Sequence, residues 1–263
     1  TMKNVTRLAL VATLGLGLPT LAVAPSFAAD QITFAVDIPE VQGSFVSGVT
    51  LETFDTGCSS PLAFGTFSGT CQSWDPNFYA GAADTSGNPS TGGSGTKMAV
   101  VPMGSEMDIE LNAPANYLGF HWEAGNEYDR VRLYSGDTLL ADFSFETLMS
   151  ALEAVSMTTQ DGGTITSVDY YGNPVTGQQA GEPYAYVHIS ASTGVTFDRV
   201  VISEDAGSPG MFEFDNMTVG FDSVADFGDT VVLDVVDLDT PVEKEALAET
   251  GVDATGIVMA AFV

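Results

Sequence analysis

Basic side chains are scarce in this chain of 263 residues. Seven Lys and Arg residues stand against 35 Asp and Glu residues, so the formal net charge at pH 7 is −28. A surface this negative repels phosphate backbones and anionic lipid headgroups, which argues against nucleic acid or a membrane surface as a partner. Divalent cations are its natural counterions, although a solvating coat is the simpler explanation for most of the carboxylates.

Histidine and cysteine are scarcer still, with two of each. Cys58 and Cys71 have no His or further Cys nearby to complete a zinc site. In an exported chain this pair predicts one structural disulfide that closes a short loop, worth about 3 kcal/mol. His121 and His188 each lie in a strand-like pattern on the face opposite its apolar residues, which predicts a surface position for both.

Catalytic motifs are absent as well. The sequence contains no nucleophile elbow, no His-Glu-x-x-His pair, no phosphate-binding glycine loop and no Cys with a matching His. We therefore expect a protein that is not an enzyme. Apolar residues make up 44% of the chain and aromatic residues 10%, which excludes a disordered acidic tail and provides for a core.

The first 28 residues have the layout of a secretory signal peptide. Lys3 and Arg7 precede an apolar run over residues 8–21, and Ser26 to Ala28 offers small residues for cleavage after Ala28. The apolar run is too short to span a bilayer, which needs about 20 residues. We expect a secreted protein without stable membrane insertion.

Short alternating runs rich in Val, Ile, Phe and Tyr, separated by turn residues, predict an all-β fold. Predicted strands cover residues 50–54, 97–101, 106–111, 117–122, 130–134, 138–143, 165–170, 185–190, 198–203 and 211–219. Their number and spacing favour a two-sheet antiparallel sandwich of the jelly-roll type over residues 29–221. In residues 117–122, Leu118, Phe120 and Trp122 share the face expected to enter the core.

Other segments interrupt or follow this pattern. Residues 135–137 (Ser-Gly-Asp) predict a tight hairpin turn, residues 146–155 a short helix that covers one end of the sandwich, and residues 75–96 a long surface loop. The C-terminal extension, residues 222–263, contains a predicted strand at 230–236, a helix at 241–249 and an apolar end at 256–263. We expect this extension to fold back onto the sandwich or to pair with another subunit.

Four segments in a fixed order carry a family resemblance. They are residues 116–122 (NYLGFHW), 126–134 (NEYDRVRLY), 196–203 (TFDRVVIS) and 212–218 (FEFDNMT). In order and spacing the chain from about residue 97 to 220 resembles the exosortase-dependent (PEP-CTERM-type) surface proteins of Gram-negative bacteria. The resemblance implies an exported β-sandwich, without known catalytic activity, at the cell surface or in extracellular matrix.

The chain departs from this family in two places. His121 stands where the family usually has Tyr, and Glu123 stands where Gly is common, so the loop after residue 122 is more polar. The family's sorting tail, with its Pro-Glu-Pro-like motif, apolar span and basic end, has no counterpart in residues 222–263. This difference leaves the route of anchoring open.

Two ligand sites are suggested by the carboxylates. The predicted sandwich resembles carbohydrate-binding jelly rolls, in which an acidic residue of the first strand and an Asp of the last often share a structural calcium. The matching positions are Glu52 or Asp55 on the first strand and Asp215 on the last. Alternatively, Asp215 and Asn216 simply form a bulge. Glu123, Glu127 and Asp129 lie in one loop beside Trp122, an arrangement suited to contact with a sugar.

Three functions follow as alternatives. The first is a non-catalytic cell-surface or matrix protein stabilised by calcium. The second is a carbohydrate-binding module, whose partner would be an extracellular polysaccharide. The third is a self-assembling subunit of a filament or surface layer that contacts other surface proteins through an open sheet edge.

Overall fold

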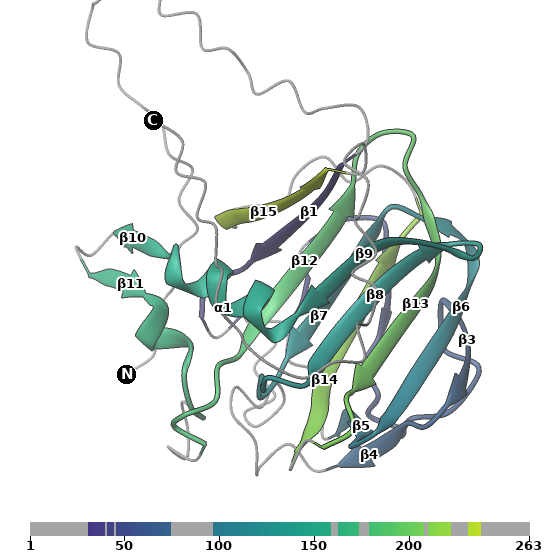
Figure 1. The fold of residues 1–263 in the computed structure, drawn as a ribbon, viewed down its shortest axis with the longest axis horizontal. Helices are drawn as coiled ribbons and strands as arrows, with labels where there is room; N and C mark the ends of the chain where they lie inside the picture. The colour runs from purple at the N-terminus through teal and green to yellow at the C-terminus, as the bar shows by residue number, and fades with distance from the viewer. Residues whose placement is uncertain are drawn as a thin grey trace, which may run out of the picture.

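The computed structural model describes residues 31–39, 41–44, 46–74, 97–158, 163–173, 179–207, 210–221 and 231–237. Two antiparallel β-sheets pack face to face in these residues, with one helix beside them (Figure 1). The predicted signal peptide, the 75–96 loop, the 241–249 helix and the apolar end at 256–263 lie outside the described residues.

Sheet A is the larger layer, and its strands follow the order β15-β1-β12-β7-β14-β5-β4, with β2 paired to β14. Their bounds are β15 (Val231–Asp237), β1 (Gln31–Val36), β12 (Ala185–Ala191), β7 (Tyr117–Trp122), β14 (Met211–Gly220), β5 (Met98–Pro102), β4 (Gln72–Trp74) and β2 (Val49–Glu52). Sheet B has the order β3-β6-β13-β8-β9. Its bounds are β3 (Gly65–Gly69), β6 (Ser105–Ala115), β13 (Phe197–Glu204), β8 (Asp129–Ser135) and β9 (Thr138–Ser144).

The strand order confirms the predicted jelly roll. Strands β5, β14, β7 and β12 lie side by side in sheet A, and β6, β13, β8 and β9 lie side by side in sheet B. From β5 to β14 the chain alternates between sheets A and B, apart from the β8–β9 hairpin and the separate two-stranded sheet of β10 and β11. That hairpin turns at Gly136 and Asp137, as predicted, and Gly136 has a positive φ of 55°.

The core lies between the two sheets. Leu118, Phe120 and Trp122 of β7 enter it, as the alternation predicts, and all three are fully buried. The Trp122 ring stacks on Phe212 of β14 with 4.8 Å between ring centroids. The predicted disulfide between Cys58 and Cys71 is also confirmed, with the two Cα atoms 5.8 Å apart.

The predicted helix is α1 (Phe145–Glu153), which begins directly after β9. The backbone N–H of Ser144 donates to Thr147 Oγ1 at 3.2 Å, which satisfies a backbone donor at the helix start. Leu148 and Leu152 are buried, and the helix packs against β1, β9 and β15. It therefore covers the side of the sandwich where β9 of sheet B approaches β1 of sheet A (Figure 1).

One predicted strand, residues 165–170, is wrong in its second half. A small hairpin of β10 (Ser156–Thr158) and β11 (Thr164–Thr166) ends there, and a 3-10 helix, η2 (Ser167–Tyr170), follows. The Asp169 carboxylate accepts the backbone N–H of Thr166 at 2.7 Å, so the side chain closes a turn that alternation does not reveal.

The strand of the C-terminal extension belongs to the sandwich. β15 pairs antiparallel with β1, so this part of the extension folds back onto its own chain, the first of the two predicted alternatives. No helix among the described residues is long and apolar enough to cross a membrane.

Candidate functional site

A hollow of about 580 Å³ opens at one end of the jelly roll, beside the loop between β7 and β8 (residues 123–128, the β7–β8 loop). The β7–β8 loop, the first residue of α1, the stretch 179–182 and the start of β14 line it. Its side chains include two aromatic rings, two amides and three carboxyl groups, from Tyr128, Phe145, Asn126, Gln179, Glu127, Glu182 and Glu213. We call this the β7–β8 hollow.

Asn126 holds the β7–β8 loop together. Its Nδ2 donates to Asp129 Oδ1 at 2.9 Å and to the backbone carbonyl of Met211 at 3.1 Å. Its Oδ1 accepts the backbone N–H of Tyr128 at 3.0 Å, and its own backbone N–H donates to Asp129 Oδ2 at 3.0 Å. One amide side chain thus connects the loop to β8 and to β14, which places Tyr128 and Glu127 at the hollow.

Asp129 lies under this loop and is fully buried. The indole Nε1 of Trp122 donates to its Oδ2 at 2.7 Å. In the pairing of β8 with β13, Asp129 stands directly opposite Glu204, which is only 1% exposed. Burial, and after it the Glu204 carboxyl group, raise the pKa of Asp129 well above its ordinary range, against the opposing effect of the Trp122 and Asn126 donors.

Glu213 forms a buried part of the wall of the β7–β8 hollow. Burial raises the pKa of this carboxyl well above its ordinary range, and the neighbouring carboxylates of Glu182, Glu204 and Glu123 add to the effect. Burial also raises the pKa of Glu182, which is about half buried. Carboxyl groups hydrogen-bond hydroxyl groups, so the wall of the hollow is able to bind them.

The structure places the four predicted sugar-contact residues in different surroundings. Trp122 is fully buried in the core, so the prediction of an aromatic platform at this residue is wrong. Glu123 is fully buried on the outer face of sheet A, where its Oε1 lies 3.1 Å from Nδ1 of His121. Glu127 is exposed and lines the hollow, and Asp129 supports the loop from below.

Sequence reasoning missed the hollow's other side chains. Phe145, Glu182 and Glu213 come from segments far apart in the chain and meet only through the jelly-roll topology. Tyr128 and Asn126 lie within one of the segments that carry the family resemblance, but no pattern distinguishes them from ordinary loop residues. The hydrogen bonds of Asn126 identify its role, and they require the folded structure.

The prediction that both histidines lie at the surface is wrong. His121 is 0% exposed and His188 is 1% exposed. They do lie on the outer face of sheet A, as alternation predicts, but residues 37–39 and 41–44 cover part of that face. Ser44 Oγ lies 2.9 Å from the Tyr117 hydroxyl, and the Gln42 carbonyl accepts from Asn216 Nδ2 at 2.8 Å.

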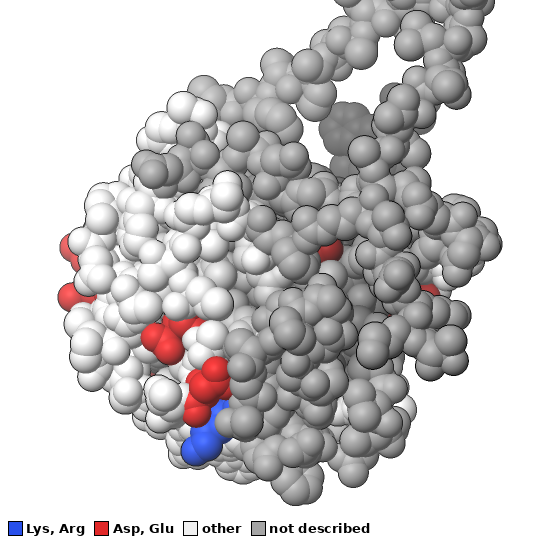
Figure 2. All heavy atoms as spheres, turned by 180° about the vertical axis from the view of Figure 1, so that it is seen from behind, with Lys and Arg blue, Asp and Glu red and all other residues white. Residues whose placement is uncertain are grey.

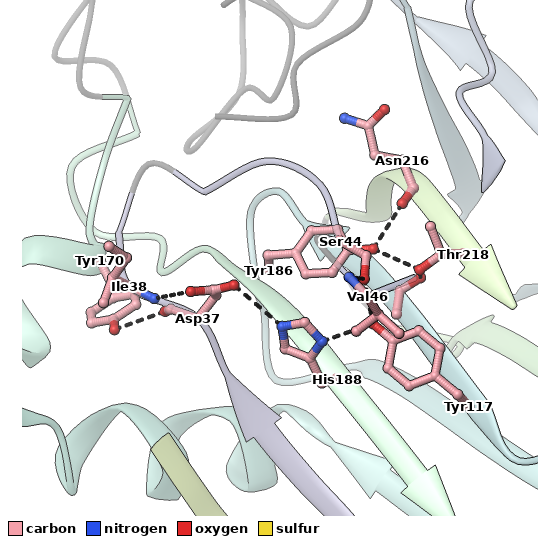
Figure 3. A network of polar contacts seen from close by, with 11 residues as sticks. Asp37, Ile38, Ser44, Val46, Tyr117, Tyr170, Tyr186, His188, Asn216 and Thr218 are labelled. Carbon is pink, nitrogen blue, oxygen red and sulfur yellow. Dashed lines mark hydrogen bonds and ion pairs between the residues drawn. The ribbon is translucent and has the colours of Figure 1, made fainter. Parts of the chain in front are cut away.

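A buried polar network connects His188 to this covering segment (Figure 3). Its Nδ1 lies 2.7 Å from the Tyr117 hydroxyl, and its Nε2 lies 3.4 Å from Asp37 Oδ2. Beside it, the Tyr186 hydroxyl lies 2.8 Å from Thr218 Oγ1. The network therefore joins β12, β7 and β14 to the segment that follows β1.

The order of carboxylate, imidazole and hydroxyl in this network is also found in sites that activate a nucleophile. Here the hydroxyl beside His188 is the phenol of Tyr117, and burial raises the pKa of Tyr117 to about 12. A phenol that is harder to ionise supplies less of the nucleophilic phenolate at neutral pH. The geometry favours a structural role, in which the network holds Asp37 and Ser44 against the sheet.

The predicted calcium ligands do not form one site. The Glu52 carboxylate accepts the backbone N–H of Ala63 at 3.0 Å, and Asp55 accepts the hydroxyl of Thr53 at 2.8 Å. Asp215 is buried, next to a β-bulge at which Asn216 has a positive φ of 48°. Within the described residues no three acidic, His or Cys side chains are grouped to hold a metal ion. Calcium binding stays a prediction from the sequence.

A second hollow, of about 520 Å³, lies on the outer face of sheet B, between the β8–β9 turn and residues 108–111. Arg199 lines it and donates to both carboxylate oxygens of Asp108, at 2.7 and 2.6 Å. Seen from behind, the described surface is mostly uncharged, with carboxylates in small separate groups (Figure 2). The acidic side chains visible there are dispersed, which fits a solvating role.

No known family model matches the chain, and none of the curated proteins matches it. Among solved structures it is similar to the catalytic domain of a GH87 α-1,3-glucanase in complex with tetrasaccharides, at 17% identity and a TM-score of 0.37. That match covers 70% of this chain and 30% of the other. The catalytic unit of the GH87 α-1,3-glucanase from Streptomyces thermodiastaticus strain HF3-3 matches at 12% identity and a TM-score of 0.33, over 70% of this chain and 27% of that one. The chain thus spans less than a third of these structures, and a likeness this weak supports no inference about activity.

Proposed function

We propose that the protein is an exported, non-catalytic surface or matrix protein whose jelly roll binds a neutral polysaccharide in the β7–β8 hollow. The observation that supports this is the composition of the hollow, where the rings of Tyr128 and Phe145 line the same space as the polar groups of Asn126, Glu127 and Glu182. Sugar rings offer apolar faces and a rim of hydroxyl groups, which such a combination accommodates.

The charge of the protein supports a neutral ligand. Uronic acid and sulfated polysaccharides would be repelled by a net charge of −28, and the described arginines do not line the β7–β8 hollow. Hydroxyl groups of a neutral glycan avoid this repulsion, and carboxyl and amide groups hydrogen-bond them directly.

The sequence supports binding without hydrolysis. It contains none of the catalytic motifs sought, neither a nucleophile elbow nor a metal-binding His pair.

The proposal is tested by calorimetric titration of the full chain with neutral oligosaccharides of glucose, mannose and xylose. Replacing Tyr128 with Ala should weaken binding by about tenfold or more, since it removes one ring from the hollow. Trp74→Ala is the matched control, because Trp74 is a partly exposed aromatic residue of β4, which pairs with the far end of β5.

Two outcomes would contradict the proposal. If no neutral glycan binds, or if Y128A and W74A lose affinity equally, the hollow is not a sugar site. Chromatography of the same mixtures after long incubation tests the non-catalytic part, which shortened oligosaccharides would overturn.

A further inference from the structure

The pair of carboxyl groups under the β7–β8 loop is not used by the proposed function. Asp129 and Glu204 face each other across β8 and β13, and both are almost completely buried. Asp129 accepts three hydrogen bonds, from Trp122 Nε1 and from the backbone and side-chain nitrogens of Asn126. Neither carboxyl oxygen of Glu204 receives a hydrogen bond from any residue that the structure describes.

Two adjacent carboxylates in a buried position cannot both remain ionised, because each destabilises the charge of the other and neither is solvated. The donors around Asp129 favour the carboxylate form at that residue. A proton on Glu204 would give it a donor directed at Asp129, and the same proton would relieve the repulsion between them.

The described arginines offer no alternative neutralisation. Arg130, Arg132 and Arg199 pair with carboxylates at the outer face of sheet B. Other charged or titratable groups lie on the elements around the pair. They are His121 of β7, Glu123, Glu127 and Tyr128 of the β7–β8 loop, Arg130 of β8, Glu182, Asp205 after β13, and Glu213 of β14. Most of these groups are acidic, so their negative charge further favours protonation of the Asp129–Glu204 pair.

We propose that Asp129 and Glu204 share one proton, and that this carboxyl–carboxylate pair positions the β7–β8 loop and thereby the hollow. Asp129 connects the pair to the loop, because two of its three hydrogen bonds come from Asn126, which in turn holds Tyr128 and Met211. The effect on the hollow rests on the proposed function, whereas the sharing of the proton does not.

The sign of the resulting pH dependence follows from the raised pKa of Asp129, caused by burial and by Glu204. An unfolded chain loses this proton near about pH 4, whereas the folded protein retains it to higher pH. Stability from the pair is therefore complete below the unfolded value and is lost as the pH rises to the folded value. Within that window the folding equilibrium constant falls by up to about tenfold per pH unit.

The experiment compares urea unfolding of the wild type and Glu204→Gln from about pH 5 to about pH 8. The glutamine amide donates to Asp129 at every pH, so the variant should show a pH slope smaller by up to one proton and a higher folding constant than the wild type at the alkaline end. Glu110→Gln, at an exposed position of β6, is the control for the loss of one charge and should keep the wild-type slope.

A second variant and a spectroscopic measurement complete the test. Asp129→Asn should be less stable, because in either orientation its amide nitrogen would face a donor, either Asn126 Nδ2 or the Trp122 indole and the Asn126 backbone N–H. The wild type should show the infrared carbonyl band of a buried protonated carboxyl at the acidic end of this range, and this band should be weaker in E204Q. Parallel pH profiles for the wild type and E204Q, or an unchanged band, would overturn the shared proton.

Sugar binding then separates this inference from the proposed function. If the pair positions the hollow, wild-type affinity for a neutral oligosaccharide should fall at alkaline pH, and E204Q should retain it. An affinity that falls equally in both proteins would overturn the link to the hollow. If no sugar binds at all, the unfolding and infrared results still decide whether the proton is shared.

Discussion

The outer faces of the two sheets differ in how they hold their polar residues. On sheet A, the polar outer face of β7 and β12 is covered, and Tyr117, Tyr186 and His188 are at most 1% exposed. On sheet B, the outer face carries arginine–carboxylate pairs that remain partly in contact with solvent, such as Arg130 with Asp142. Both faces read as polar in the sequence, yet the part of sheet A formed by β7 and β12 is shielded from water.

This difference teaches that alternation along a strand identifies a face without determining its environment. A buried polar group left without a partner costs about 1–3 kcal/mol, whereas an exposed ion pair contributes about 0–1 kcal/mol. Equivalent substitutions on the two outer faces should therefore have unequal effects, which provides a direct way to test the comparison.

The largest effect is expected at Gly119, on the outer face of β7. A Cβ atom there would lie 2.5 Å from the Tyr117 hydroxyl, 2.8 Å from Thr218 Oγ1 and 2.9 Å from the Tyr186 hydroxyl. Gly119→Ala must displace these hydroxyls and break their hydrogen bonds, with an expected loss of about 3 kcal/mol in the free energy of unfolding. Urea unfolding measures it.

Gly181→Ala serves as the control for this change, because a Cβ atom at Gly181 would have no neighbour within 4 Å. Its stability should stay close to that of the wild type. Equal stability of G119A and G181A would show that the covered face of sheet A is loosely packed.

A smaller effect is expected from removing one hydroxyl on each face. Tyr117→Phe removes the hydroxyl beside His188 Nδ1 and Ser44 Oγ, and should cost about 1–2 kcal/mol. Tyr134→Phe makes the same chemical change on the half-buried outer face of sheet B and should cost less than about 0.5 kcal/mol. Thermal unfolding of both variants compares the faces directly, and equal losses would remove the distinction between them.

The smallest effect is expected on sheet B. Arg199 and Asp108 form a bidentate ion pair, and their side chains are 33% and 20% exposed. The guanidinium carbon of Arg199 also lies 4.7 Å from the centre of the Tyr134 ring. Arg199→Ala should cost about 1 kcal/mol or less, and the loss should shrink as salt is added. Unfolding at low and high salt measures this, with Arg199→Lys as the variant that keeps the charge. A loss of several kcal/mol at high salt would mean that this face is effectively buried.

Strand alternation was sufficient to predict most of the jelly roll. In residues 117–122 it predicts both the bounds of β7 and the inward side of Leu118, Phe120 and Trp122. Strands β3 and β4 carry little of this pattern, since one has glycine at both ends and the other has three residues, and neither was predicted. Alternation also cannot reveal a turn closed by a side chain, as at Asp169.

The candidate site was predictable only in part. Glu127 and Asp129 are close in sequence, and both contribute to the hollow or its support. The pairing of Asp129 with Glu204 depends on the register between β8 and β13, and a pattern within either strand does not contain it. Burial of His188 and Trp122 depends on what packs over each face, which short-range periodicity does not specify.

The position of β1 has a consequence for how the molecule is completed. This first described strand lies between β12 and β15, which follow it late in the chain. Sheet A therefore cannot be completed during synthesis until residues up to 237 have left the ribosome. Proteins dominated by such distant pairings fold over milliseconds to seconds, because the entropy of loop closure is lost before the contacts stabilise the fold. Both edges of β1 therefore stay unpaired until β12 and β15 have been synthesised.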